Sequence, residues 1–143
     1  IAEIIFRRYE TRVIAEMGGI RSQTPKFTSM FLILVMASIS LPSTFNFVGE
    51  FTVLYSLSQI NIWFAILGGT TIILGAYYML RMFQHAMLGE TNSKLFADVS
   101  INEGITLVAI IVVLLFFGLY PKPIIDLITP SLEEILNQIN RIN

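Results

Sequence analysis

Residues 27–57, FTSMFLILVMASISLPSTFNFVGEFTVLYSL, decide how this chain must fold. The 31 residues carry only one charged side chain, Glu50. As one straight helix they would be about 46 Å long, whereas the hydrocarbon core of a bilayer is roughly 30 Å thick and needs about 20 residues. The stretch is therefore too long for one span and too short for two full spans with a turn. It is either a hairpin of two short spans or one broken span, and we favour the broken span because neither half can cross alone.

We expect the interruption at Pro42 to Asn46, just before the acidic residue. Proline lacks the backbone N–H of a continuing helix and clashes with the preceding turn. Three polar side chains of this run, Ser43, Thr44 and Asn46, can either cap the freed backbone groups or hold water around the break. Gly49 stands directly before the acid. Transporters often build an ion site from a broken helix beside a buried charge, and this sequence has both features.

Glu50 is the first candidate for a functional residue. An ionised carboxylate inside a bilayer costs roughly 2.5 to 3.5 kcal/mol on insertion scales unless it is neutralised or hydrated. A functional carboxyl would gain and lose a proton as neighbouring charges change, as a proton relay requires. The alternative is a structural acid that faces water at a helix end or pairs with a lysine elsewhere. We favour the functional interpretation because nothing else in the stretch explains the charge.

The composition places the whole chain in the membrane class. Of 143 residues, 55% are hydrophobic and 13% are charged, which is too apolar for an ordinary soluble domain. The absence of cysteine excludes disulfides, iron–sulfur clusters and cysteine-bound metals, and a single histidine makes no metal centre alone. No phosphate-binding loop or nucleophile–base pair is visible, and a net charge of −1 gives no argument for nucleic acid. The first residue is not the start of a signal peptide, so we expect a piece of a longer protein.

The rest of the chain predicts further helices and no strands. We expect the end of a preceding helix and an aqueous loop in residues 1–26, the broken span in 27–57, continuous spans in 62–84 and 104–120, and an amphipathic surface helix in 130–143. Apolar residues recur at helical spacing in that last segment, namely Leu132, Ile135, Leu136, Ile139 and Ile142. Thr129 is the expected cap of the surface helix. The predicted fold class is thus an all-α integral membrane protein with one discontinuous transmembrane helix.

A second group of polar residues, Arg81, Gln84 and His85, lies where the 62–84 span should end. Such residues commonly anchor a helix at the headgroup level, which is the simpler interpretation. The alternative is a proton-entry or relay role, because histidine titrates near neutral pH. Asp98 and Glu103 are expected to be solvated loop charges.

Residues 41–51, LPSTFNFVGEF, resemble the signature of the antiporter-like subunit M family of respiratory complex I, the proton-pumping NADH:quinone oxidoreductase. Residues 17–20, MGGI, after Thr11-Arg12, and residues 118–124, GLYPKPI, with Asp126 are similar to other segments of that family. The family often has Gly-Leu-Pro-Gly before the break, where this chain has Ser40-Leu41-Pro42-Ser43.

The resemblance implies a many-helix subunit with inverted repeats, of which this chain would supply a discontinuous helix and two further spans. Glu50 matches the terminal glutamate of a chain of glutamate and lysine residues at mid-membrane depth, where subunits L and N have lysine. The implied function is proton translocation coupled to quinone reduction in other subunits. NADH, FMN, iron–sulfur clusters and quinone would bind those subunits, and no cofactor would bind here. The implied partners are the L- and N-type subunits and the lipid bilayer, in the bacterial inner membrane or, alternatively, the mitochondrial one.

Two other functions stay open at this point. The chain can belong to a multisubunit cation/proton antiporter or a membrane-bound hydrogenase, which share the broken helix. It can also be a structural membrane-packing protein, in which case Glu50 would be dispensable. Catalysis within this chain is the least favoured option, because no catalytic constellation is visible.

Overall fold

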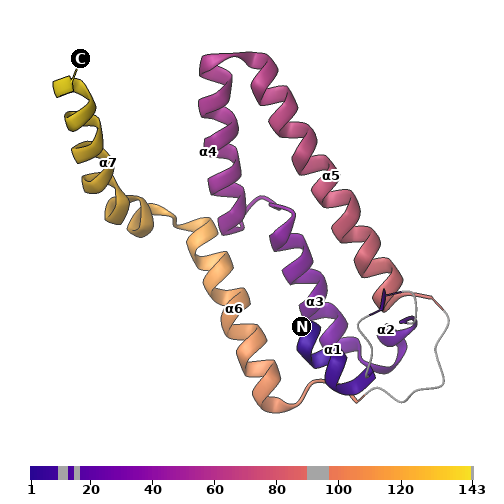
Figure 1. The fold of residues 1–143 in the computed structure, drawn as a ribbon. Helices are drawn as coiled ribbons and strands as arrows, with labels where there is room; N and C mark the ends of the chain where they lie inside the picture. The colour runs from indigo at the N-terminus through magenta and orange to yellow at the C-terminus, as the bar shows by residue number, and fades with distance from the viewer. Residues whose placement is uncertain (10–12, 15–16, 90–96, 143) are drawn as a thin grey trace.

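The computed structural model describes residues 1–9, 13–14, 17–89 and 97–142, which form seven α-helices and no strand (Figure 1). The all-α expectation is confirmed. The helices are α1 (Ala2–Tyr9), α2 (Ile20–Gln23), α3 (Pro25–Ser38), α4 (Phe45–Ile60), α5 (Ile62–Met87), α6 (Ile101–Leu119) and α7 (Lys122–Ile142). The end of a preceding helix, expected before residue 19, corresponds to α1, and residues 10–12 and 15–16 lie outside the described part.

The interruption predicted in the long apolar stretch is present, but it lies earlier than expected. Helix α3 ends at Ser38 and α4 begins at Phe45, so the non-helical residues are 39–44. Asn46, which we had assigned to the break, lies in the first turn of α4. The correction has a local cause, because α3 ends in a C-terminal capping motif upstream of the proline.

Two acidic residues expected to be solvated loop charges instead fix helix ends. The Asp98 carboxylate accepts hydrogen bonds from the N–H groups of Phe27 (3.1 Å) and Val99 (2.8 Å), which joins the start of α3 to the entry of α6. Glu103 and Ser100 form a capping box at the start of α6. Glu103 also pairs with Arg8 of α1 at 2.6 Å. Both side chains therefore hold the polar end of the bundle together.

The apolar core sits at this same end, where α1, α2, α3, α5 and α6 meet. Its buried side chains are Ile5, Ile20, Phe27, Phe31, Val35, Phe83, Ala86, Met87 and Leu107. Helix α3 lies between α5 and α6 and contacts both (Figure 1). By contrast, α4 contributes no buried residue. The helix after the break is therefore much less enclosed than the helix before it.

Helices α4 and α5 form a hairpin joined at Asn61, whose side chain accepts a hydrogen bond from the Trp63 N–H at 2.9 Å. Near this turn they approach closely, since a Cβ placed on Gly68 would lie 2.9 Å from the Leu54 Cδ2 atom. Helices α5 and α6 are each long and apolar enough to cross a membrane. The two continuous spans expected from the sequence therefore have helical counterparts, and α5 extends to Met87.

The C-terminal helix α7 is longer than predicted. It begins at Lys122 and contains Pro130, whereas we expected the amphipathic helix to start at residue 130. Thr129 does not cap it, because its hydroxyl donates to the Ile125 carbonyl (2.7 Å) inside the helix. Helix α7 extends away from the others (Figure 1). The side chains of Leu136, Ile139 and Ile142 lie outside the described residues, so the surface contact of this helix stays a prediction.

Candidate functional site: a cleft beside the helix break

The first half of the break is the C-terminal cap of α3. The Leu41 N–H bonds to the Met36 carbonyl (3.1 Å) and the Ser40 N–H bonds to the Ala37 carbonyl (3.3 Å). Ser40 has a φ of 58°, in the left-handed region. This combination of hydrogen bonds and a left-handed residue is the Schellman motif, which usually has glycine at that position. The motif ends α3 before Pro42 is reached.

The second half of the break is a tight turn. The Thr44 N–H bonds to the Leu41 carbonyl at 3.0 Å, Pro42 occupies the second position, and Ser43 has a φ of 82°. These are the features of a type II turn, whose third residue is normally glycine. The Thr44 hydroxyl also donates to the Leu41 carbonyl at 2.7 Å, so it closes the turn and does not cap α4.

The backbone thus explains the Gly-Leu-Pro-Gly pattern of the family that the sequence resembles. Ser40 and Ser43, which occupy its two glycine positions, are the two non-glycine residues with positive φ in the described part of the chain. Serine adopts this conformation at a steric cost that glycine does not have. The break of this chain therefore has the backbone conformation that the two glycines of the pattern favour, although it has serine at both positions.

Helix α6 packs directly on the break through Gly118. A Cβ placed on Gly118 would overlap the Ser43 carbonyl oxygen and lie 2.6 Å from the Thr44 Cα atom. These are backbone atoms, which yield much less readily than the end of a flexible side chain. Gly118 therefore permits the close approach of α6, and the turn after α3 is supported from this side.

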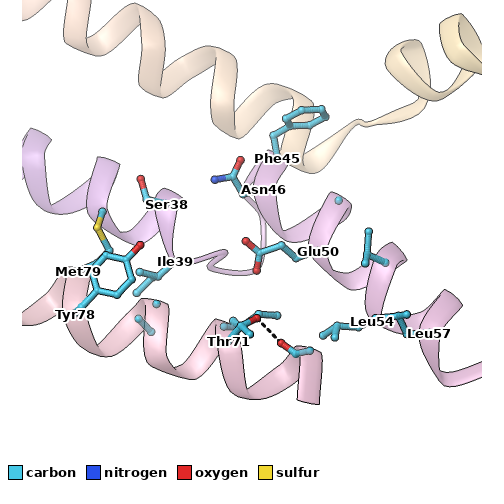
Figure 2. A pocket seen from close by; sticks show the side chains of 16 residues that line it. Ser38, Ile39, Phe45, Asn46, Glu50, Leu54, Leu57, Thr71, Tyr78 and Met79 are labelled. Atoms are coloured by element: carbon cyan, nitrogen blue, oxygen red, sulfur yellow. Dashed lines mark hydrogen bonds between the residues drawn. The ribbon is translucent and has the colours of Figure 1, made fainter. Parts of the chain in front are cut away.

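A cleft of about 700 Å³ opens between α4 and α5 beside the break (Figure 2). Its lining residues are Ser38, Ile39, Phe45, Asn46, Gly49, Glu50, Val53, Leu54, Leu57, Gly68, Thr71, Ile72, Gly75, Ala76, Tyr78 and Met79. A Cβ on Gly75 would meet only Tyr78 of its own helix within 4 Å, in contrast to the tight contact at Gly68. The helices are thus close near their turn and leave space beside the break.

Glu50 is the only charged side chain among these lining residues. It lies in the second turn of α4, is half-buried, and projects into the space that α5 borders (Figure 2). Asn46, four residues earlier, lies on the same helix face and also lines the cleft. Within the part of the chain that the structure describes, Glu50 forms no hydrogen bond or ion pair. Its carboxylate is available to water or to a partner.

The cleft also contains hydroxyl groups that can hold water. Ser38 donates to the Leu34 carbonyl at 2.9 Å, and Thr71 donates to the Gly68 carbonyl at 2.7 Å. Since each hydroxyl uses its only proton on the backbone, its oxygen remains an acceptor for a water molecule. Acceptors on both walls can orient water around Glu50.

The structure brings together only some of the residues that the sequence singled out. Asn46 and Gly49 line the cleft with Glu50, whereas Pro42, Ser43 and Thr44 shape the break and do not line it. Arg81, Gln84 and His85 are exposed on α5 and none of them lines the cleft. The described residues contain no cluster of three or more histidine, aspartate and glutamate side chains that could hold a metal ion.

Comparison with known proteins agrees with this architecture. A family model described as "NADH:quinone oxidoreductase/Mrp antiporter, TM" matches residues 1–75, which include α3, the break and α4. The chain belongs to this family. The match ends within α5, so it covers both halves of the broken span and the Glu50 side of the cleft.

Individual relatives cover nearly the whole chain. The NADH-quinone oxidoreductase subunit M of Rickettsia typhi is 36% identical over 139 residues, which are 95% of this chain and 28% of that protein. The subunit M of Rhodobacter capsulatus is 32% identical, over 93% of this chain and 27% of that protein. The resemblance to subunit M inferred from residues 41–51 is thereby confirmed. The chain spans about a quarter of the length of these relatives.

A solved structure has the same arrangement of helices. A chain of respiratory complex I from Thermus thermophilus, determined with bound NADH, is 28% identical and superposes with a TM-score of 0.77. The match covers 82% of this chain and 25% of that one. The fold described here is therefore that of a portion of this complex I chain.

Sequence reasoning missed the role of Gly118 and the contribution of α5 to the site. Gly118 was visible as part of the GLYPKPI segment, but no pattern within one helix shows which backbone it will meet. Gly68 and Gly75 mark a small-residue face of α5, and such a face predicts close packing but not the partner helix. Both signals needed the tertiary arrangement before they could be interpreted.

Proposed function

We propose that this chain is part of the proton-translocating membrane arm of an NADH:quinone oxidoreductase and that Glu50 is its proton-exchanging group. The observation that carries the proposal is the position of Glu50, a carboxylate without a partner among the described residues, in a largely apolar cleft beside a helix break that also holds a few polar side chains. A carboxyl in such a place changes protonation when a nearby positive charge arrives or leaves. Water held by Asn46, Ser38 and Thr71 supplies the path for the proton.

The break contributes in a way that a continuous helix cannot. It leaves backbone groups free at the start of α4, and these are tolerated inside a membrane only where protein or water covers them. The cleft beside residues 39–44 offers such cover. We therefore place the break at mid-membrane depth, with the hydrated cleft reaching Glu50 from one side.

The redox chemistry of this function belongs to other subunits. NADH, FMN, iron–sulfur clusters and quinone would bind there, and quinone reduction would change the charge beside Glu50. The neighbours in the membrane arm would be antiporter-like subunits of the L and N type, in the bacterial inner membrane. The relatives named above are bacterial proteins, which favours this membrane over the mitochondrial one.

The proposal is tested by Glu50→Gln in the full-length subunit within its complex. Glutamine keeps the shape and hydrogen bonding but cannot exchange a proton, so translocation in reconstituted vesicles should fall by roughly tenfold or more, as for the loss of a general acid–base. Coupled NADH:quinone turnover should fall with it, while assembly stays normal. Glu50→Asp should be milder and Glu50→Ala at least as severe as glutamine.

The matched control is Glu133→Gln on α7, which removes an exposed carboxylate far from the break. It should leave pumping unchanged at equal complex content. Unchanged pumping in Glu50→Gln would return Glu50 to a structural role. Loss of assembly without a specific loss of pumping would favour a membrane-packing protein.

An antiporter is the second candidate, because the matched family also includes Mrp antiporters by its description. A cation/proton antiporter would move protons in response to a sodium gradient, with no need for NADH. Vesicles with an imposed sodium gradient and no NADH separate the two functions. We expect NADH-driven pumping only.

A further inference from the structure

A separate polar cluster lies on α5, formed by Tyr77, Arg81 and His85. One Arg81 Nη atom donates to the Tyr77 hydroxyl oxygen at 2.6 Å, and the Arg81 Nε atom lies 3.5 Å from the His85 Nε2 atom. The guanidinium carbon also lies 5.9 Å from the centroid of the Tyr77 ring. All three side chains are exposed, and none lines the Glu50 cleft. The cluster is therefore not part of the site described above.

The packing of α5 on α3 gives the depth of this cluster. Phe83 packs against Phe31 of α3 with ring centroids 5.5 Å apart, and Met87 lies beside Thr28, one turn nearer the start of α3. Arg81, two residues before Phe83, is thus level with the middle of α3, whose residues 31–36 are all apolar. By helix geometry it lies about 9 Å further from the polar end than Met87. Arg81 is therefore level with apolar residues of α3 and lies six residues before the end of α5.

The guanidinium is held between the two other side chains of the cluster. Tyr77 lies one turn closer to the middle of α5 than Arg81, and the hydrogen bond holds the Arg81 head against it. An arginine that reaches for a lipid phosphate extends in the opposite direction, toward the nearer membrane surface. Because the Tyr77 hydrogen bond keeps the Arg81 head from extending that way, a protein partner at the same depth is favoured over a headgroup.

The charge on Arg81 has no counter-ion within the described residues. The ion pairs among the described residues join Arg7 to Glu3 and Arg8 to Glu103, and neither pair includes a residue of α5. A guanidinium has five N–H donors, and the Tyr77 and His85 contacts use two of them. The remaining donors form the fork that matches a carboxylate. The Tyr77 hydroxyl proton is also free to bond to the same carboxylate.

We propose that Tyr77 and Arg81 form a docking site, within the membrane, for an aspartate or glutamate on a neighbouring transmembrane helix outside α1–α7. The buried side chains at this end of α5, Phe83, Ala86 and Met87, face the core with α3. The cluster lies on the opposite side of α5, where a neighbouring helix can pack without entering the Glu50 cleft. This inference requires only that α5 is embedded in the membrane, so it stands independently of proton exchange at Glu50.

The test uses the assembled membrane complex with a photo-crosslinking phenylalanine analogue in place of Leu74, which is exposed on the same face of α5. We expect a crosslink to a helix with an aspartate or glutamate within one turn of the attachment point. Arg81→Gln should lower the yield of this crosslink by about tenfold or more, because the carboxylate of the partner helix would lose its counter-ion inside the membrane. Arg81→Lys should restore part of it. The control Gln84→Ala, an exposed neighbour, should leave the yield unchanged.

A charge exchange gives the decisive result. Arg81→Glu combined with arginine at the mapped carboxylate should recover the crosslink and the assembly that Arg81→Glu alone loses. Failure of the double variant to recover either would overturn the proposal. A crosslink to phospholipid alone, or a yield in Arg81→Gln equal to that of the unchanged complex, would also overturn it, and the phospholipid adduct would assign Arg81 to a headgroup. Proton pumping does not enter this readout, so a failure here is distinct from a failure at Glu50.

Discussion

The two halves of the broken span have similar apolar sequences but opposite surroundings. Helix α3 buries Phe27, Thr28, Phe31, Val35 and Ala37, whereas α4 buries no residue. The half before the break is thus fixed in the core, and the half after it contacts its neighbours only through partly exposed faces. The difference shows what the break accomplishes. It allows one apolar segment to anchor the bundle and to present a carboxylate in a cleft.

The largest difference between the halves should appear when a phenylalanine is removed from each. Phe27 of α3 is fully buried, whereas Phe51 of α4 is 58% exposed. We expect Phe27→Ala to lower the free energy of unfolding by roughly 3 kcal/mol, the lower end of the range for soluble cores, because lipid also solvates the ring. Phe51→Ala should cost much less. Unfolding of the full chain in bicelles measures both, and equal losses would contradict the comparison.

A smaller effect is expected where α6 supports the break. Gly118→Ala should destabilise the chain by about 1 to 3 kcal/mol, because its Cβ meets the backbone of Ser43 and Thr44. The control is Gly104→Ala in the same helix, where a Cβ would meet nothing within 4 Å. That change should be neutral or stabilising, since alanine favours a helix over glycine. If both variants behave alike in the unfolding experiment, α6 does not pack on the break.

The smallest effect concerns the two serines with positive φ. Ser40→Gly and Ser43→Gly should each stabilise the chain by roughly 0.5 to 1 kcal/mol, because glycine removes the left-handed strain but adds freedom to the unfolded chain. Ser40→Gly should gain more, since it also removes a buried hydroxyl that has no hydrogen-bond partner in the described residues. Ser38→Gly, at the last residue of α3, where the backbone is helical, is the control and should destabilise. A loss of stability in the two break variants would contradict this account of the turn.

The sequence predicted the features that depend on residues close together in the chain. Length against bilayer thickness predicted the interruption of the helix, which the structure contains. The isolated charge of Glu50 indicated a candidate site, and its role in proton exchange stays a prediction. The break was placed too late because proline was the visible signal, whereas the Schellman motif at Ser40 ends the helix before it. The surface helix was expected to begin only at residue 130, whereas α7 begins at Lys122 and includes Pro123 and Pro130.

The remaining differences depend on contacts between distant segments. Asp98 was expected to be a solvated charge because nothing near it in sequence shows that it will meet the Phe27 N–H. The same holds for the pair between Arg8 and Glu103 and for the approach of Gly118 to the break. Such contacts join residues about 70 to 95 positions apart in this chain, so local pattern and propensity carry no information about them.

The most direct test of the central claim is to observe protonation of Glu50 itself. Infrared difference spectra of the reconstituted complex, taken at rest and during NADH-driven turnover, report carboxyl groups that gain or lose a proton. We expect a carboxyl band that is present in the unchanged complex and in Glu133→Gln but absent in Glu50→Gln. The same band in all three would mean that Glu50 keeps one protonation state throughout turnover, and that the cleft beside the break is not a proton-exchange site.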